Sequence, residues 1–178
     1  MKTLKRVGVF LFASLFAVGG FYISLLVSAK RITPEQTKTV DRAIDLLEQR
    51  GFSSEAFYLK HFTAFRATDN WLNASVEKEN AYAATNFPFE IMTLYFEFFA
   101  VPLDDTERAA ILLHEAKHLQ GKDEKGAYEY VWKNRKQLGW TSDKYGGSEI
   151  WQTVRNQTKD YSPNLFLCEN IRGGDCTE

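Results

Sequence analysis

The first thirty residues limit this chain more than any other segment, because they contain one long uncharged run. Its apolar part extends from Val7 to Val27, 21 residues. A helix of that length reaches ~30 Å, which is the thickness of the hydrocarbon core of a bilayer. Lys2, Lys5 and Arg6 precede the run, and positive charge before a span directs that end to the cytoplasm. We therefore expect residues 1–30 to form an uncleaved signal anchor.

The end of the same run offers an alternative. Val27, Ser28 and Ala29 make a small-x-small pattern that a signal peptidase can cut. The apolar region of a signal peptide usually has about 7–15 residues, so the longer run favours the anchor. Cleavage after Ala29 would instead release the rest of the chain as a secreted protein.

The remaining residues, 31–178, are expected to form a single domain outside the cytoplasm. They are numerous enough for one hydrophobic core, and they show no internal repeat or low-complexity segment. The net charge of −1, with lysines and arginines scattered along the chain, provides no basic surface for nucleic acid. The partner that this part of the chain predicts is the membrane, through residues 7–27.

Two cysteines, Cys168 and Cys176, stand near the end of the chain and flank a short polar loop. An oxidising compartment outside the cytoplasm favours joining them. We expect a disulfide that holds the C-terminal tail in place.

The first helix of the domain is marked by its ends. Thr33 precedes Pro34 and Gln36, which is the pattern of an N-cap, a first-turn proline and a capping box. Gly51 is typical of a helix end. Aromatic residues between Phe52 and Asn80 recur at helical spacing, so we expect a second helix there.

A strand and further helices follow. Alternating residues from Phe89 to Tyr95 favour a short strand that leads into a turn. Asp104 then has the pattern of an N-cap, with Glu107 three residues later as its capping-box partner. The helices that we expect after this point cover residues 105–120, 124–138 and 148–158.

The helix over residues 105–120 carries the segment with the clearest chemistry. His114 and His118 are four residues apart, which places both imidazoles on one face and within reach of a single Zn²⁺ ion. Glu115 stands next to the first histidine, where it can take a proton from a water whose pKa the zinc lowers. The pattern predicts two zinc ligands and a general base, although the same residues can also form the exposed face of a structural helix.

Residues 89–99, 103–108 and 114–118 together resemble the zincin superfamily of metallopeptidases. The resemblance implies an edge strand that binds extended substrate backbone, followed by a helix that supplies two histidines and a glutamate base. It also implies an α+β, mainly helical catalytic domain behind the N-terminal membrane helix.

A catalytic zinc usually has three protein ligands and one open position, so a third ligand is needed. Glu124 is the first candidate, because Gly121 stands where metzincins, a branch of the zincins, turn the chain towards the metal. The segment that begins at Glu124 is also similar to the ligand helix of gluzincins. Glu129, on the same helix, and Asp143, in a stretch similar to aspzincins, are the second and third candidates. Charges at such positions are also common on solvated helices.

The expected function is that of a membrane-anchored zinc metallopeptidase, in which Glu115 is the catalytic base and a protein or peptide is the substrate. A non-catalytic envelope module with a structural or vestigial metal site is the alternative, and the need for a base separates the two. Tyr128, Tyr130 and Tyr145 can donate to a developing oxyanion, but packing is the ordinary role of such residues. His61 is expected to be structural.

Overall fold

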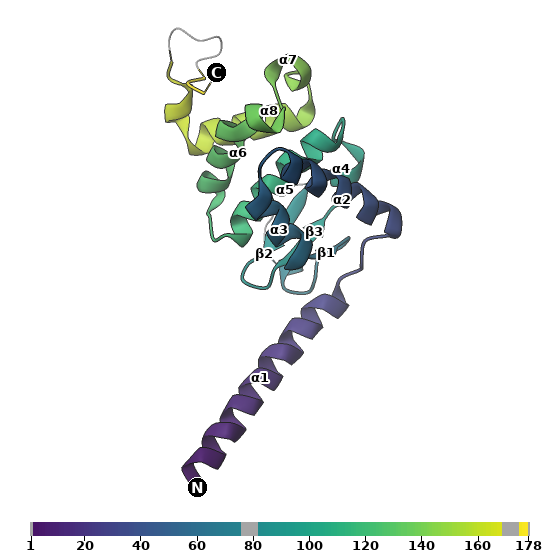
Figure 1. The fold of residues 1–178 in the computed structure, drawn as a ribbon, viewed down its shortest axis with the longest axis vertical. Coiled ribbons are helices and arrows are strands. Elements are labelled where there is room, and N and C mark those ends of the chain that lie inside the picture. The colour runs from purple at the N-terminus through teal and green to yellow at the C-terminus, as the bar shows by residue number, and fades with distance from the viewer. Residues whose placement is uncertain (1, 76–81, 169–174, 178) are drawn as a thin grey trace.

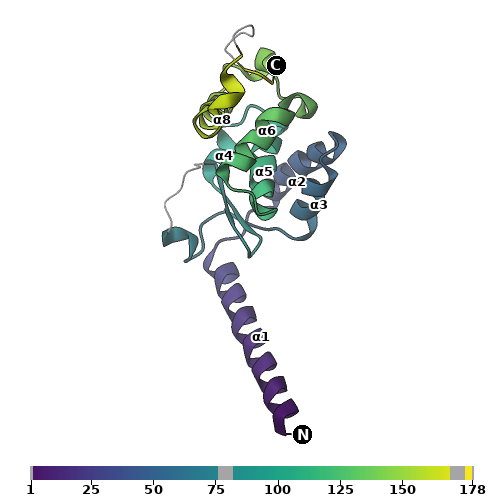
Figure 2. The same cartoon turned by 90° about the vertical axis from the view of Figure 1, so that its left-hand side faces the viewer.

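The computed structural model describes residues 2–75, 82–168 and 175–177 (Figure 1). Helix α1 (Lys2–Ser28) projects as a rod from the rest of the chain, which is mainly helical and contains a small sheet (Figures 1 and 2). Within the described residues, α1 is the one helix that is long and apolar enough to cross a membrane, and a signal sequence can have the same properties.

The elements after α1 form two groups along the chain. The first group contains the sheet and the helices around it: α2 (Pro34–Gln49), α3 (Ser53–His61), β1 (Ala64–Arg66), η1 (Asn73–Ser75), β2 (Ala83–Asn86), β3 (Ile91–Leu94), α4 (Phe96–Ala100) and α5 (Asp105–Leu119). The second group is helical: α6 (Glu124–Leu138), α7 (Ser142–Tyr145), α8 (Glu149–Tyr161) and η2 (Pro163–Phe166).

Helix α2 confirms the predicted start signal. The Thr33 side chain accepts from the Gln36 backbone N–H, while the Gln36 side chain accepts from the Thr33 N–H, so the capping box is complete. Its apolar stripe is buried and packs on α3 and α5. The buried side chains of this stripe are Val40, Ala43, Ile44 and Leu47.

The sheet has the order β1-β3-β2, with β1 parallel and β2 antiparallel to β3. The predicted strand over residues 89–95 is β3, which is shorter because residues 87–90 form a turn in which Glu90 has a φ of 48°. β3 is the central strand, so the expectation of an edge strand at this position is wrong. The edge strand that packs on α5 is β2.

The predicted helix over residues 52–80 is wrong beyond His61. After α3 the chain turns into β1, where the Ala64 N–H donates to the Glu90 carbonyl and the strand pairs with β3. The helical part of this region therefore ends with α3, because the backbone groups that follow form their hydrogen bonds in the strand pair. Residues 76–80 lie outside the described residues. The turn expected after Tyr95 is instead the short helix α4.

Helix α6 has the predicted bounds, and it ends at Gly139, whose φ of 80° suits a residue without a Cβ. Helix α8 packs on α6 around three tryptophans, Trp132, Trp140 and Trp151, whose rings lie within 4.9–6.4 Å of one another. This second group forms the far end of the domain from α1 (Figure 1).

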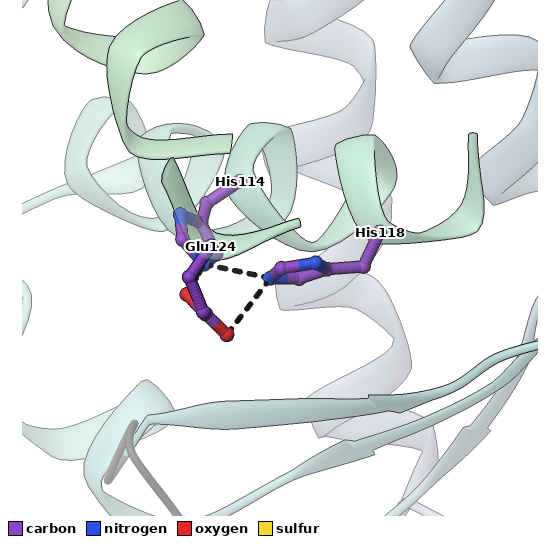
Figure 3. Close-up of side chains that lie close together, drawn as sticks. All are labelled: His114, His118 and Glu124. Carbon is purple, nitrogen blue, oxygen red and sulfur yellow. Dashed lines mark hydrogen bonds and ion pairs between the residues drawn. The ribbon is translucent and has the colours of Figure 1, made fainter. Parts of the chain in front are cut away.

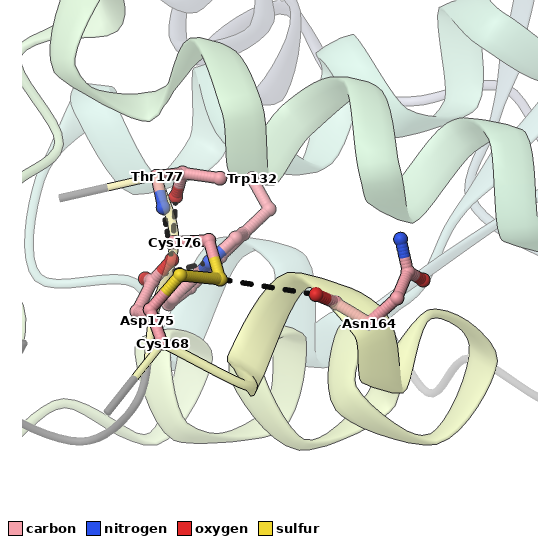
Figure 4. The surroundings of a disulfide bond; sticks show 6 residues. All are labelled: Trp132, Asn164, Cys168, Asp175, Cys176 and Thr177. Atoms are coloured by element: carbon pink, nitrogen blue, oxygen red, sulfur yellow. Dashed lines mark hydrogen bonds between the residues drawn. A yellow bond between two sulfur atoms is a disulfide. The ribbon is translucent and has the colours of Figure 1, made fainter.

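The predicted disulfide joins Cys168 to Cys176 (Figure 4). Next to it Asp175 is buried and accepts from the Arg135 guanidinium and from the Trp132 indole N–H, each at 2.9 Å. The tail is therefore fixed to α6 by charge as well as by the disulfide. Residues 169–174 of the loop between the cysteines lie outside the described residues.

Candidate metal centre

Helix α5 passes through the core and carries both histidines of the predicted site. Asp104 caps it by accepting from the Thr106 N–H at 2.9 Å. Glu107 does not complete a capping box with Asp104, and this part of the prediction is wrong. Its buried carboxylate accepts from the Leu103 N–H at 2.8 Å and from the Ser148 hydroxyl, so it links the start of α5 to α8.

Three side chains meet at the junction of α5 and α6 (Figure 3). The Nε2 atoms of His114 and His118 are 3.0 Å apart. Each also lies 3.2 Å from a Glu124 oxygen, His114 from Oε2 and His118 from Oε1. Ligand atoms at 2.0–2.1 Å from a tetrahedral Zn²⁺ are ~3.3 Å from one another. All three separations are close to that value.

The turn between the helices brings Glu124 back to the histidines. Gly121 adopts a φ of 77°, which L residues with a Cβ rarely tolerate, and the Lys122 N–H donates to the Lys117 carbonyl. The carboxylate of Asp123 then caps α6 by accepting from Gly126 N–H at 2.8 Å. Glu124 is the first residue of α6, where its charge also suits the helix dipole.

The same turn fixes the orientation of one imidazole. His118 Nδ1 lies 2.9 Å from the carbonyl oxygen of Lys122 and can only donate to it, which leaves Nε2 to face Glu124 and His114. A backbone carbonyl on the far ring nitrogen is the usual arrangement around metal-ligating histidines. Within the described residues, His114 Nδ1 is buried without a hydrogen-bond partner. The His114 ring is held by Tyr128 instead, with ring centroids 4.2 Å apart.

The charges of the cluster are strongly coupled. Burial lowers the pKa of His118, but the hydrogen bond with Glu124 and the Glu115 charge outweigh it and raise that pKa to about 9. Burial raises the pKa of Glu124, and the two histidines outweigh it and hold that pKa at about 2. In the metal-free chain these two shifts have the directions that an ion pair between His118 and Glu124 produces.

Glu115 is buried beside the cluster, on the side of α5 that faces the sheet. The Thr85 hydroxyl on β2 donates to its Oε2 at 2.7 Å. The charge of Glu115 also contributes to the raised pKa of His118, three residues further along α5. The predicted base is therefore held by an edge-strand residue that sequence reasoning missed, since a strand-to-helix contact across 30 positions leaves no local signal.

The other two candidates for a third ligand lie elsewhere. Glu129 pairs with Lys133 at 2.7 Å and accepts from the Ser162 hydroxyl at 2.5 Å. Asp143 is exposed on α7. Among the described residues, the one group of three histidine, cysteine or carboxylate side chains with donor atoms within 4.8 Å of one another is His114, His118 and Glu124.

The remaining residues singled out from the sequence have packing or surface roles. The ring of Tyr130 lies under the Lys117 ammonium, and the Tyr145 hydroxyl donates to Asp104 at 2.8 Å. Besides contacting His114, the ring of Tyr128 stacks on Tyr161. His61 is exposed at the end of α3 and packs against Phe57.

A buried ion pair supports the helix that carries the histidines. Lys117, inside the His-Glu-x-x-His segment, pairs with Glu55 of α3, and both side chains are at most 7% exposed. The ammonium also donates to Gln120 at 2.9 Å and lies 3.5 Å from the centroid of the Tyr130 ring. α5 is therefore tied to α3 through the residue that precedes His118.

No family model matches this chain, and no curated protein or solved structure matches it. No activity can be carried over from a relative on this basis. The residues of the cluster, their separations and their charges are therefore what indicates a function.

Proposed function

We propose that this chain is a membrane-anchored zinc metallopeptidase of zincin type. His114, His118 and Glu124 are the proposed zinc ligands, and Glu115 is the proposed catalytic base. The observation that carries the proposal is the set of three donor separations of 3.0–3.2 Å between two imidazole nitrogens and a carboxylate. Two imidazoles and one carboxylate also match the ligand set of known zinc peptidases.

A bound zinc ion would polarise the substrate carbonyl and lower the pKa of water to about 7. In the proposed reaction Glu115 accepts a proton from the attacking water while the water oxygen bonds to the carbonyl carbon of the substrate. It then delivers that proton to the amine nitrogen as the C–N bond breaks. Thr85 holds the carboxylate in place for both transfers.

The sheet supports a peptide as the substrate. β2 is one of the two edge strands of the described sheet, and its Thr85 contacts the proposed base. An extended peptide that adds to this edge by main-chain hydrogen bonds would bring its backbone next to Glu115. This is a general way to bind polypeptides of different sequence.

The location proposed for the enzyme follows from α1 and the tail. α1 would span the membrane with the cationic residues before it in the cytoplasm, which leaves the catalytic domain outside. The disulfide between Cys168 and Cys176 supports an oxidising location for the domain.

The first test is the zinc content of the full-length protein purified in detergent. We expect about one zinc per chain for the wild type, as one three-ligand site implies. Glu124→Gln should lose the metal, because a ligand charge is removed while the shape of the side chain is kept. Glu129→Gln is the matched control on the same helix and should keep it. A zinc-free wild type, or loss of zinc from the control alone, would refute the site.

The second test separates an enzyme from a non-catalytic zinc module. Glu115→Gln should keep the zinc but lose hydrolysis of a quenched-fluorescence peptide library, since the base is needed only for turnover. Removal of one catalytic group of this kind typically costs 10²–10⁴-fold in rate. A wild type that binds zinc and cleaves none of the peptides would favour the non-catalytic envelope module.

A further inference from the structure

The end of α1 is packed against aromatic side chains of the domain. The ring of Phe21 lies 5.5 Å from Trp71 and 5.3 Å from Phe89, centroid to centroid. The Trp71 indole N–H donates to the Ser24 hydroxyl at 3.2 Å. Phe89 belongs to the turn between β2 and β3, which lies on the side of the domain nearest to α1 (Figures 1 and 2).

Hydrogen bonds with the backbone of Leu26 and Lys30 hold the domain at this height on α1. The Arg66 side chain donates to the Leu26 carbonyl at 3.3 Å. The Ala67 N–H donates to the Lys30 carbonyl at 2.8 Å, and the Lys30 N–H donates to the Thr68 hydroxyl at 3.0 Å. Contacts before and after Ser28, the last residue of α1, therefore fix the position of the domain along α1.

The position of Phe21 gives the depth of this contact in a membrane. Phe21 stands six residues before Val27, the last residue of the apolar run. At ~1.5 Å per residue it lies ~9 Å inside that run, and the common tilt of ~20° changes this little. The side chains that touch Phe21 are therefore at the level of the upper acyl chains.

The surface of the domain at this level is aromatic and open. Phe87, in the β2–β3 turn, is 59% exposed and Trp71 is 49% exposed. Exposed Lys30 and Arg31 follow directly after α1, where long cationic side chains can reach the headgroup level. Tryptophan beside cationic residues is typical of the membrane interface. We call Trp71, Phe87 and Phe89 the aromatic rim.

We propose that the aromatic rim inserts into the outer leaflet of the bilayer, so that the catalytic domain is partly embedded and does not sit on a free stalk. The partner is a lipid surface, and the contact continues the one between the domain and α1. The proposal depends on the anchor part of the proposed function and is independent of the zinc site.

Tryptophan fluorescence can test the insertion of Trp71. The chain has four tryptophans, and the other three are at most 3% exposed in the core around α6 and α8. Full-length protein is reconstituted in phosphatidylcholine–phosphatidylglycerol vesicles whose acyl chains carry bromine at different depths. The wild type should be quenched most by bromine in the upper half of the chains. Trp71→Phe, which keeps a ring against Phe21, should lose this component.

A second pair of variants tests the rim without removing the probe. Phe87→Asp should reduce acyl-chain quenching of Trp71, because a charge at this depth opposes insertion. Phe96→Asp is the matched control, since Phe96 is 76% exposed and lies on α4, away from α1 (Figure 1). Both positions are exposed, so neither change disturbs the core.

Three results would overturn the proposal. The first is a Trp71 component that aqueous iodide quenches and brominated lipids do not. The second is equal quenching in the Phe87→Asp and Phe96→Asp variants. The third is a purified protein whose mass shows that residues 1–29 have been removed, which refutes the anchor as well. Failure of the zinc and peptidase tests alone leaves the expected quenching unchanged, so the two proposals fail separately.

Discussion

Glu55→Gln is expected to destabilise the domain far more than a change of one charge on its surface. The substitution leaves the Lys117 ammonium buried without a carboxylate, and the side chains of this pair are 6% and 7% exposed. Removal of one partner from a buried pair typically costs about 3–5 kcal/mol, because the remaining charge is uncompensated. For a domain of this size each kcal/mol lowers the melting temperature by about 2–4 °C, which gives a decrease of about 6–20 °C.

The assay is thermal unfolding of the full-length protein in detergent, followed by circular dichroism, for both single variants and the double variant Glu55→Gln with Lys117→Met. The double variant should be more stable than the sum of the singles predicts, since no buried charge is left without a partner. Lys133→Met is the control, because it breaks the Lys133–Glu129 pair, in which the lysine is 47% exposed. Such a pair is worth about 0.3–0.5 kcal/mol.

Two results would refute the reasoning. A decrease for Glu55→Gln no larger than for Lys133→Met would mean that the pair is solvated. Strict additivity in the double variant would mean that Glu55 and Lys117 contribute through separate contacts and not through each other.

Three further predictions follow from the same structure. The metal-free protein should be most stable between about pH 4.5 and 6.5. The stability that His118 contributes is lost as the pH rises towards its pKa of about 9 in the folded state. The stability that Glu124 contributes is lost as the pH falls towards its folded-state pKa of about 2. Glu124→Gln should flatten this profile, as urea unfolding at several pH values would show. Cys168→Ser should cost about 2.5 kcal/mol in denaturant unfolding, from closure of a short loop, and equal stability of the oxidised and reduced wild type would contradict this. Thr85→Val should lower peptide turnover about 10–100-fold at unchanged zinc content, whereas Thr85→Ser should keep it, and equal rates for both variants would remove the role of the hydroxyl.

The parts of the fold that sequence predicted best carry local signals. Caps, first-turn residues and an αL glycine are read within a few positions of one another, and they marked α2 at Thr33 and the end of α6 at Gly139. The strands are short and depend on partners far along the chain. β1 pairs with β3 across 27 positions. Aromatic spacing alone therefore predicted, wrongly, that a helix continues through this region.

The candidate site shows the same division. His114, Glu115 and His118 are four residues apart at most, and helical periodicity alone predicted that the imidazoles share a face. Glu124 joins them through the turn at Gly121, a glycine visible in the sequence. The Thr85 hydroxyl reaches the site through the packing of β2 on α5, which no spacing in the sequence reveals.

Two nearby positions of the β2–β3 hairpin face different surroundings. Thr85, which holds the proposed base, is two residues from Phe87 in the aromatic rim, or ~7 Å along an extended strand. A peptidase built in this way would select its bonds by height above the lipid. In a neighbouring protein of the same bilayer, the peptide bond within reach would lie about two to four extended residues from the end of that protein's own membrane span. Bonds in domains tens of ångströms away would pass out of range, whatever their sequence.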